Sequence, residues 1–416
     1  MVSLLRMAAM LLLLSSAAPN ASTMDITASF SPSMSDPENN TFTNTTPQSG
    51  FCGKWPQYCP ANTFSIGLPI TTTISKPITA HNDPHEGVFF GLPGKKREVM
   101  VTDINSGEKH PVTFTITNFS AIAHFPNDQG QKAWDTDDGT LGSPSSSSSC
   151  SRRANPAGGR TIFSFVWNVP AEDVACYATS AIDRTEPTAF DGLSIGYNLI
   201  TPNPLIMGSG TYTGVLSLSV GPGGDFDFGN NYQASDTNLT INFTLSVNHE
   251  LKLTTSPEDR QVTLQPCASG RVCTEEEGKA NWERSTITRI APQLTGRSHF
   301  TLSSSGAFTV FLQCDQQIGQ DCALQSEHSA KQVPVQALLT LPTTIVDQHT
   351  GSTVIQKKIR VGKDTVQNVF NTTQFGQDRK GSIDFVIAQK DVENMLKTRP
   401  DNYKGTMTVI FDPQIY

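Results

Sequence analysis

Apolar and polar residues alternate along most of this chain, which is the pattern of β-strands that bury one face. The longest run, 239–247, places Leu, Ile, Phe, Leu and Val on one side. Shorter runs lie at 112–116, 163–169, 308–312, 335–341 and 403–411. Helical periodicity is almost absent, and the segments 171–175 and 391–396 have room for only a turn or two. The pattern predicts an all-β protein made of antiparallel β-sandwiches.

A weak internal repeat divides the chain into two similar halves. In each half a strand and a short helical turn are followed by a strand that opens with Tyr-x-Gly. The first copy joins 163–174 to Tyr212, and the second joins 383–392 to Tyr403. The spacer between the two parts is much longer in the first half. We therefore expect a loop insertion at about 177–207.

The length of 416 residues is enough for two domains, each with a core of its own. The polar residues 248–250 separate the alternating run that ends at Val247 from the one that begins at Leu251. This predicts an N-terminal domain at 23–247, a linker at 248–250 and a C-terminal domain at 251–416.

The N-terminus has the pattern of a secretory signal peptide, which we place at 1–22. Arg6 precedes the apolar run 7–14, and small residues follow it. The apolar run is far shorter than the ~20 residues that a membrane anchor needs. The next stretch, 23–50, is rich in Ser, Thr and Asn, which predicts an extended and poorly packed lead-in. We expect an exported, soluble protein.

Charge and cysteine content narrow the class further. The formal net charge is −8, only 16% of residues are charged, and no basic stripe suits nucleic acid. Eight cysteines in an exported chain indicate disulfides, although many pairings are possible. Pairing neighbours in the sequence is the simplest hypothesis, whereas zinc sites would need closer CxxC pairs. The pairs would be Cys52 with Cys59, Cys150 with Cys176, Cys267 with Cys273, and Cys314 with Cys322.

Two motifs could suggest chemistry, but their contexts argue against it. Residues 192–196 match the GxSxG elbow of hydrolases, with Ser194 as nucleophile, yet Pro202 and Pro204 rule out the helix that should follow. His and acidic residues gather at 81–86, but Pro84 prevents helical presentation to a metal, and a solvated turn explains them. We expect no enzyme activity, no cofactor and no metal.

Two small basic groups are candidates for receptor binding. Arginine can hold the carboxylate of an acidic sugar while an aromatic ring such as that of Trp134 stacks on the sugar. The simpler interpretation is that these charges are solvated in loops. The candidates are Lys95, Lys96, Arg97, Arg152 and Arg153. Seven Asn-x-Ser/Thr triplets also leave open a glycosylated secreted protein, although Thr-rich strands produce such triplets by chance.

Several short patterns resemble one known family. They are Val-Pro-Ala-Glu at 169–172, Val-Leu-Ser-Leu at 215–218, Thr-Ile-Asn-Phe-Thr at 240–244, and a last strand that opens Tyr403-x-Gly405 and ends Phe-Asp-Pro at 411–413. Together they resemble the CblD-like pilus biogenesis initiators. These are minor pilins, including tip adhesins, of alternate (class 5, colonisation-factor type) chaperone–usher fimbriae.

The resemblance implies two immunoglobulin-like domains, an adhesin and a pilin whose sandwich lacks its final strand. The missing strand leaves a hydrophobic groove in the pilin domain. A periplasmic chaperone fills this groove first, and at an outer-membrane usher the N-terminal strand of the next pilin replaces it. The major pilin and a host-cell glycan or glycoprotein receptor would be the further partners, with the chain displayed at the fimbrial tip. Residues expected to line the groove are Tyr403, Met407, Val409 and Phe411.

One departure from the family limits what can be transferred. Colonisation-factor members carry a receptor-binding arginine pair after the strand that matches 215–220, whereas this chain has Gly-Pro-Gly-Gly-Asp-Phe at 221–226. The receptor residues therefore cannot be carried over. Two other functions stay open: a chain-internal pilin that donates the strand 25–30, and a secreted serine hydrolase.

Overall fold

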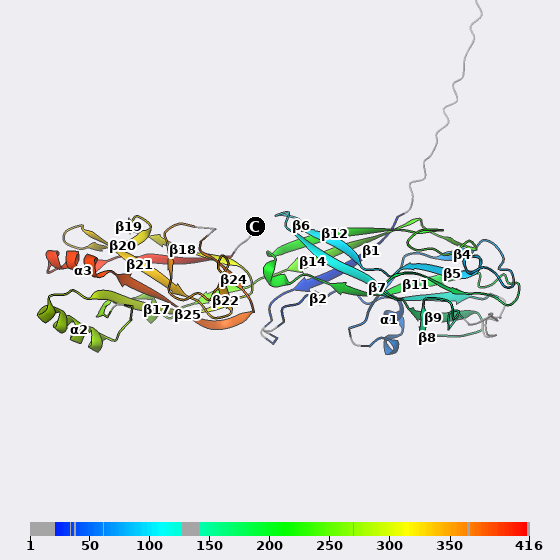
Figure 1. Cartoon of the computed structure of the whole chain (residues 1–416), viewed down its shortest axis with the longest axis horizontal. Helices are drawn as coiled ribbons and strands as arrows, with labels where there is room; N and C mark the ends of the chain where they lie inside the picture. Colours follow the sequence, from blue (N-terminus) through cyan, green and yellow to red (C-terminus); the bar gives the residue numbers. More distant parts are fainter. Residues whose placement is uncertain are drawn as a thin grey trace, which may run out of the picture.

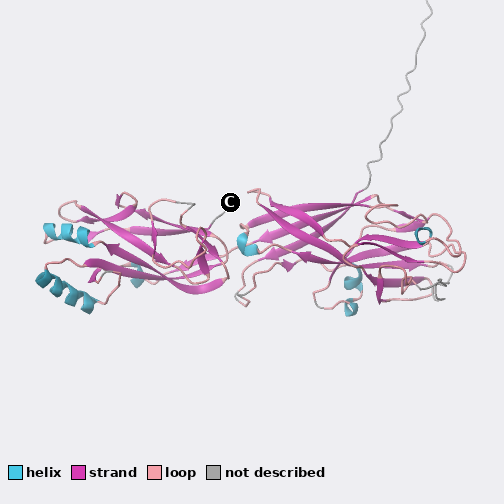
Figure 2. Ribbon diagram, viewed as in Figure 1, coloured by secondary structure: helices cyan, strands magenta, loops and turns pink. Residues whose placement is uncertain are grey.

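The computed structural model describes residues 21–413 except 34, 37–38, 61, 127–140, 269 and 364–366. The described chain is almost entirely β-structure, in two domains that lie end to end (Figure 1). Figure 2 shows strands throughout both domains, with the longer helices confined to the far end of the second. Residues 1–20 of the expected signal peptide lie outside the described residues. No helix in the described chain is long and apolar enough to cross a membrane.

The first domain is built on one large sheet that encloses a hydrophobic core. In pairing order its strands are β13 (Tyr232–Ala234), β4 (Thr72–Ile74), β11 (Ala189–Ile200), β7 (Lys109–His124), β6 (Arg97–Asp103), β12 (Gly210–Ser219), β14 (Asn238–Val247), β1 (Ala21–Phe30) and β2 (Thr43–Asn44). Beside this path, β3 (Phe64–Gly67) pairs with β11, β9 (Ile162–Asn168) with β7, and β8 (Ser151–Ala154) with β9. A separate pair joins β5 (Val88–Pro93) to β10 (Asp173–Ala178).

Aromatic side chains fill the centre of this core. The Phe90 ring lies 4.8 Å from that of Phe119 and 5.7 Å from that of Trp167, and all three side chains are fully buried. Buried aromatic rings of this size supply much of the hydrophobic stabilisation of a domain. The runs predicted at 112–116 and 239–247 lie in β7 and β14 and bury their apolar positions as expected. Most of the run at 163–169 lies in β9, which buries residues 164–167 on both faces.

The prediction of a poorly packed lead-in at 23–50 is wrong for residues 23–30. Residues 21–30 form β1, which pairs in parallel with β14 along its whole length. Its alternating residues Met24, Ile26, Ala28 and Phe30 are at most 5% exposed. Polar composition suggested a loose segment, but every second residue is apolar, and that suffices to complete a half-buried strand.

The predicted loop insertion at 177–207 is also wrong. Its middle is β11, an inner strand that pairs with β7, β3 and β4. Five successive residues, 193–197, are buried, so both faces of the strand are covered. This strand was not predicted, although residues 193–199 alternate between apolar and polar or Gly positions. The turn expected at 171–175 is likewise no helix, because β10 begins at Asp173.

The second domain is a sandwich of two sheets. The larger sheet has the order β15 (Leu251–Thr254), β17 (Gln293–Ser304), β25 (Gly376–Ile387), β21 (Gln332–Thr340), β20 (Asp321–Ser326) and β19 (Gln317–Ile318). Three strands flank it: β16 (Gln265–Cys267) on β17, β23 (Lys357–Ile359) on β21, and β26 (Tyr403–Lys404) on β20. The smaller sheet has the order β22 (Ile345–Asp347), β24 (Val369–Thr372), β18 (Phe308–Cys314) and β27 (Met407–Pro413).

The helices of the described residues are few and lie outside the sheets. They are α1 (Gly50–Lys54), α2 (Glu275–Thr288) and α3 (Gln389–Met395), with short 3-10 turns at 56–58, 84–86, 204–206, 258–260 and 396–398. The helical turns predicted at 391–396 fall in α3 and the turn after it. Helix α2 was not predicted. Its N-terminus has a capping box in which Thr274 and Glu277 satisfy each other's backbone N–H groups.

The four predicted disulfides are confirmed. The structure joins Cys52 to Cys59, Cys150 to Cys176, Cys267 to Cys273, and Cys314 to Cys322. No cysteine is left free. Each bridge joins two cysteines that are neighbours in the sequence, so it tethers local segments within one domain.

Candidate functional site

The last strand, β27, forms an open edge of the second domain. It pairs with β18 from Met407 to Pro413, and no other described strand pairs with it. The backbone groups on its other side therefore lack a β-partner within the described chain. An unpaired edge of this length is a template for a strand from another chain.

The side chains of β27 show that the core is incomplete at this edge. Met407, Val409 and Phe411 pack against the core but are only partly buried. On β18, Leu312 pairs with Val409 and Val310 pairs with Phe411, and both β18 side chains are at most 1% exposed. Neighbouring strands of one sheet thus differ sharply in burial, because no strand of the described chain pairs with the outer side of β27.

Strand β15 is a second open edge of this domain. Both β15 and β27 contact the part of β17 around residues 300–304. β15 pairs with residues 301–304 of β17, while the Phe411 ring lies 5.3 Å from that of Phe300. β15 has no other partner strand in the described chain, and Leu253 is 38% exposed. Within the described chain, each sheet of the sandwich therefore ends in a strand with one unpaired side near this stretch of β17.

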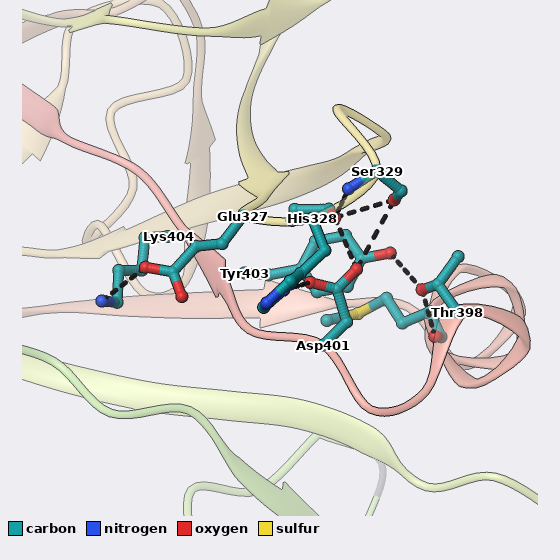
Figure 3. Close-up of polar contacts among 9 residues, drawn as sticks. Glu327, His328, Ser329, Thr398, Asp401, Tyr403 and Lys404 are labelled. Carbon is teal, nitrogen blue, oxygen red and sulfur yellow. Dashed lines mark hydrogen bonds and ion pairs between the residues drawn. The ribbon is translucent and has the colours of Figure 1, made fainter.

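Polar contacts hold the chain in place just before β27 (Figure 3). The Tyr403 hydroxyl lies 2.8 Å from Thr398 Oγ1, and the Lys404 ammonium lies 2.6 Å from Glu327. Asp401 contacts His328 at 3.1 Å, and the hydroxyl of Ser326 lowers the pKa of this carboxyl. Tyr403, which the sequence analysis assigned to the groove, lies on β26 beside β20 rather than on β27. Its contacts fix where β27 begins.

The first domain has a polar cleft of about 710 Å³ on one side. Its lining combines amide, hydroxyl and aromatic side chains from β2, β3, β7, β9 and β11 with Arg153 of β8. The lining residues are Ala28, Phe42, Thr43, Asn44, Asn62, Thr63, Phe64, Thr117, Asn118, Arg153, Asn168, Tyr197, Asn198, Leu199 and Thr201. A cleft of this size and mixed polarity can hold a small polar ligand.

Hydrogen bonds fix the inner wall of the cleft. Arg153 Nη1 donates to Asn118 Oδ1 at 3.1 Å, and Asn118 Nδ2 donates to Asn168 Oδ1 at 3.0 Å. Asn44 Nδ2 donates to the Tyr197 hydroxyl at 3.0 Å. Burial raises the pKa of Tyr197, so this hydroxyl stays neutral. These side chains are held before any ligand arrives.

The candidate receptor residues do not form one site. Arg97 is held in ion pairs with Asp173 and Asp225, at 3.3 and 3.2 Å. Lys95 and Lys96 are exposed in the turn before β6, and neither lines the cleft. Arg152 is exposed on β8, whereas its neighbour Arg153 lines the cleft. Trp134 lies outside the described residues.

The motifs with possible catalytic or metal chemistry have structural roles. Ser194 lies in the middle of β11 and is fully buried, and its Oγ accepts a hydrogen bond from the Phe51 N–H at 3.1 Å. No strand-to-helix elbow exists there. His85 Nε2 contacts Asp227 Oδ2 at 2.8 Å. Within the described residues, no three His, Cys, Asp or Glu side chains gather where they could hold a metal ion.

Comparisons with known proteins give only distant structural similarity. No family model matches the chain, and no curated protein matches it. Among solved structures it is similar to CfaE, the adhesive subunit of CFA/I fimbria of enterotoxigenic Escherichia coli, at 10% identity over 96% of this chain and 95% of that one, with a TM-score of 0.24. A chaperone–tip adhesin complex of CFA/I fimbriae matches at 11% identity over 95% and 97%, with a TM-score of 0.25. The CsuC–CsuE chaperone–tip subunit complex of Acinetobacter baumannii Csu pili matches at 8% identity over 95% and 99%, with a TM-score of 0.20.

Proposed function

We propose that this chain is the tip subunit of a chaperone–usher pilus, whose second domain accepts a donor strand from the next pilin. The observation that carries the proposal is the open edge of β27. On one side its backbone has no partner strand among the described residues, and its apolar residues Met407, Val409 and Phe411 are partly exposed. A donated strand would pair with this backbone and cover these side chains.

The same edge explains the partners that the resemblance implies. An uncovered strand with apolar residues would aggregate during export, so a periplasmic chaperone would cover it until assembly. The outer-membrane usher would then exchange the chaperone for the N-terminal strand of the major pilin. The subunit that accepts a strand and donates none starts the fibre, and its first domain would be displayed at the tip to bind a host-cell glycan or glycoprotein.

The first strand bears on the alternative of a chain-internal pilin. Such a subunit needs a free N-terminal segment to donate. Here residues 25–30 lie within β1, whose ten residues pair with β14 and whose Ile26 and Phe30 are at most 1% exposed. Donating this segment would remove a strand from the first domain, so we favour the tip position. A hydrolase based on Ser194 is disfavoured because that side chain is fully buried.

The proposal is tested by adding a donor peptide to the full chain. The peptide copies the N-terminal strand of the major pilin, and the control peptide carries Asp at its alternating apolar positions. We expect the donor peptide to raise the unfolding temperature of the second domain and the control to have no effect. Equal stability with and without the donor peptide would refute the missing strand.

The position in the fibre needs a separate measurement. Immunogold labelling of purified pili with antibody to this chain should mark fibre ends only. Labels along the shaft would show that the chain is an internal subunit.

A further inference from the structure

The cleft of the first domain has the size and lining of a ligand site, and it lies in a different domain from the open edge of β27. It measures about 710 Å³, within the range of pockets that hold small molecules. Its residues come from segments between positions 28 and 201, so it exists only in the folded domain. The question is which ligand its chemistry would select.

The charge of the cleft favours an anion. Arg153 is the only charged side chain in the lining, and no Asp or Glu is among the lining residues. Its contacts within the described chain are neutral acceptors, namely Asn118 Oδ1 and, at 3.4 Å, the Tyr58 carbonyl oxygen. A guanidinium has five N–H donors in a fork that matches a carboxylate. Arg153 therefore has further N–H donors, and a positive charge that no acidic lining residue balances, available to a ligand.

The neutral polar groups of the cleft suit hydroxyl groups. Asn62 and Asn198 are exposed at its surface, and their side chains have no hydrogen-bond partner among the described residues. Each amide offers a donor and an acceptor a short distance apart. This arrangement matches adjacent hydroxyls of a sugar ring, whereas a purely apolar ligand would leave these amides unpaired.

One wall of the cleft is aromatic. Phe64 is partly buried, and its ring lies 6.2 Å from that of the buried Tyr197. Phe42 is also partly buried, with its ring 6.4 Å from that of Phe30. The partly exposed rings of Phe42 and Phe64 add apolar surface to the cleft, against which the C–H face of a sugar can pack.

We propose that this cleft binds a sugar that carries a carboxylate. Arg153 pairs with the carboxylate, the amides of Asn62 and Asn198 bind ring hydroxyls, and Phe64 supports the apolar face. The assignment rests on the proposed adhesive role of the first domain, and it names the ligand class and the residues that select it. These four residues come from β3, β8, β11 and the loop before β3.

The test measures binding of sialyllactose and of lactose, its neutral counterpart, to the full chain by titration calorimetry. The chain is purified from bacterial periplasm. We expect sialyllactose to bind and lactose to bind at least tenfold more weakly, because the charge-assisted pair with Arg153 is lost. Equal binding of the two sugars, or of neither, would overturn the proposal.

Variants locate the site. R153Q should weaken sialyllactose binding at least tenfold, while K109Q removes the same charge on β7 outside the cleft and should leave binding unchanged. Equal weakening by R152Q would move the site to the outer face of β8 and overturn the cleft. N62A, at an exposed position, should weaken the binding of both sugars. Unchanged binding by N62A would count against the cleft even if R153Q does not fold.

The outcome can be separated from that of the proposed function. Donor-peptide stabilisation of the second domain does not involve the cleft, so its failure refutes the tip role alone. Pili that carry R153Q and still adhere to cells at the original level would overturn the cleft while leaving the tip role intact.

Discussion

His249 Nε2 lies 2.9 Å from the carbonyl oxygen of Met207 in the first domain. The other ring nitrogen, Nδ1, lies 3.2 Å from Ser305 Oγ in the second domain. Gly306 allows this approach, because a Cβ there would lie 2.7 Å from the imidazole. A single linker side chain therefore connects the two domains. Since Nε2 faces a carbonyl oxygen, it carries the proton, and Nδ1 accepts from the Ser305 hydroxyl.

The His249 contact predicts a junction that weakens in mild acid. Burial lowers the pKa of His249 below its usual value of 6.5, although the Met207 carbonyl opposes the shift. His249 thus takes up a proton more readily in the unfolded chain than in the folded chain. Its contribution to the free energy of unfolding is therefore complete above pH 6.5 and is lost as pH falls toward the lowered pKa. Between these limits, stability should fall by up to about 1.4 kcal/mol per pH unit.

The measurement is thermal unfolding of the full chain between pH 5 and 8, alone and as H249Q. Glutamine keeps hydrogen-bonding capacity but does not titrate. The variant should lose the part of the pH dependence that His249 contributes. An identical pH profile in the two proteins would contradict the prediction.

The disulfides of the first domain should differ in their effect on stability. Cys150–Cys176 closes a segment with a sequence separation of 26, and Cys52–Cys59 one of 7. Loop-closure entropy assigns about 3.5 kcal/mol to the first bridge and about 2.4 kcal/mol to the second. Denaturant unfolding of the two double Cys→Ser variants compares them. A larger loss without Cys52–Cys59 would show that loop entropy does not govern these bridges.

The pair Arg297–Asp384 should matter more than any exposed pair. Arg297 Nε and Nη2 donate to the two carboxylate oxygens at 2.5 and 2.8 Å, and the Asp384 side chain is only 2% exposed. R297M would leave this carboxylate buried without its cation. We expect a loss of about 2 kcal/mol, below the ~3–5 kcal/mol of fully buried pairs because Arg297 is partly exposed.

The control for R297M is K279M on helix α2. The Lys279–Glu275 pair is exposed on both sides, so its loss should change the denaturation midpoint far less. A similar shift in both variants would mean that the burial of Asp384 adds nothing.

The sequence predicted the strands that bury one face and the four disulfides, because both signals are local. It failed where pairing partners are distant in the sequence and where a long spacer was interpreted as a loop. The parallel pairing of β1 with β14 joins residues 217 positions apart, such as Asp25 and Asn242, and no local pattern reveals it. β11 was missed although its residues 193–199 alternate between apolar and polar or Gly positions, because the long spacer between the two parts of the repeat was interpreted as a loop.

The candidate sites were predictable to different degrees. Met407, Val409 and Phe411 alternate within one segment, so their common face could be read from the sequence. Helix α2 buries only Gly278 and has no apolar stripe, and its one sequence signal was the capping box that begins at Thr274. The cleft could not be predicted, because folding assembles its lining from many separate segments.

The two faces of β27 provide the sharpest test of the open edge. Val409 lies opposite the buried Leu312 of β18 and packs on the core, whereas Thr408 lies opposite Gln313, and both of these are exposed. A donated strand would cover the inner face only. V409R should therefore abolish binding of the donor peptide to the full chain, and T408R should leave it unchanged.

A milder pair of measurements separates lost binding from lost folding. V409A removes apolar contact without adding charge, and about 1 kcal/mol of lost burial corresponds to roughly fivefold weaker peptide binding. Fluorescence anisotropy with a labelled donor peptide measures this, and circular dichroism checks that each variant is folded. If T408R blocks the peptide as strongly as V409R, the strand is not captured against the inner face of β27, and the site of strand exchange must lie elsewhere on the second domain.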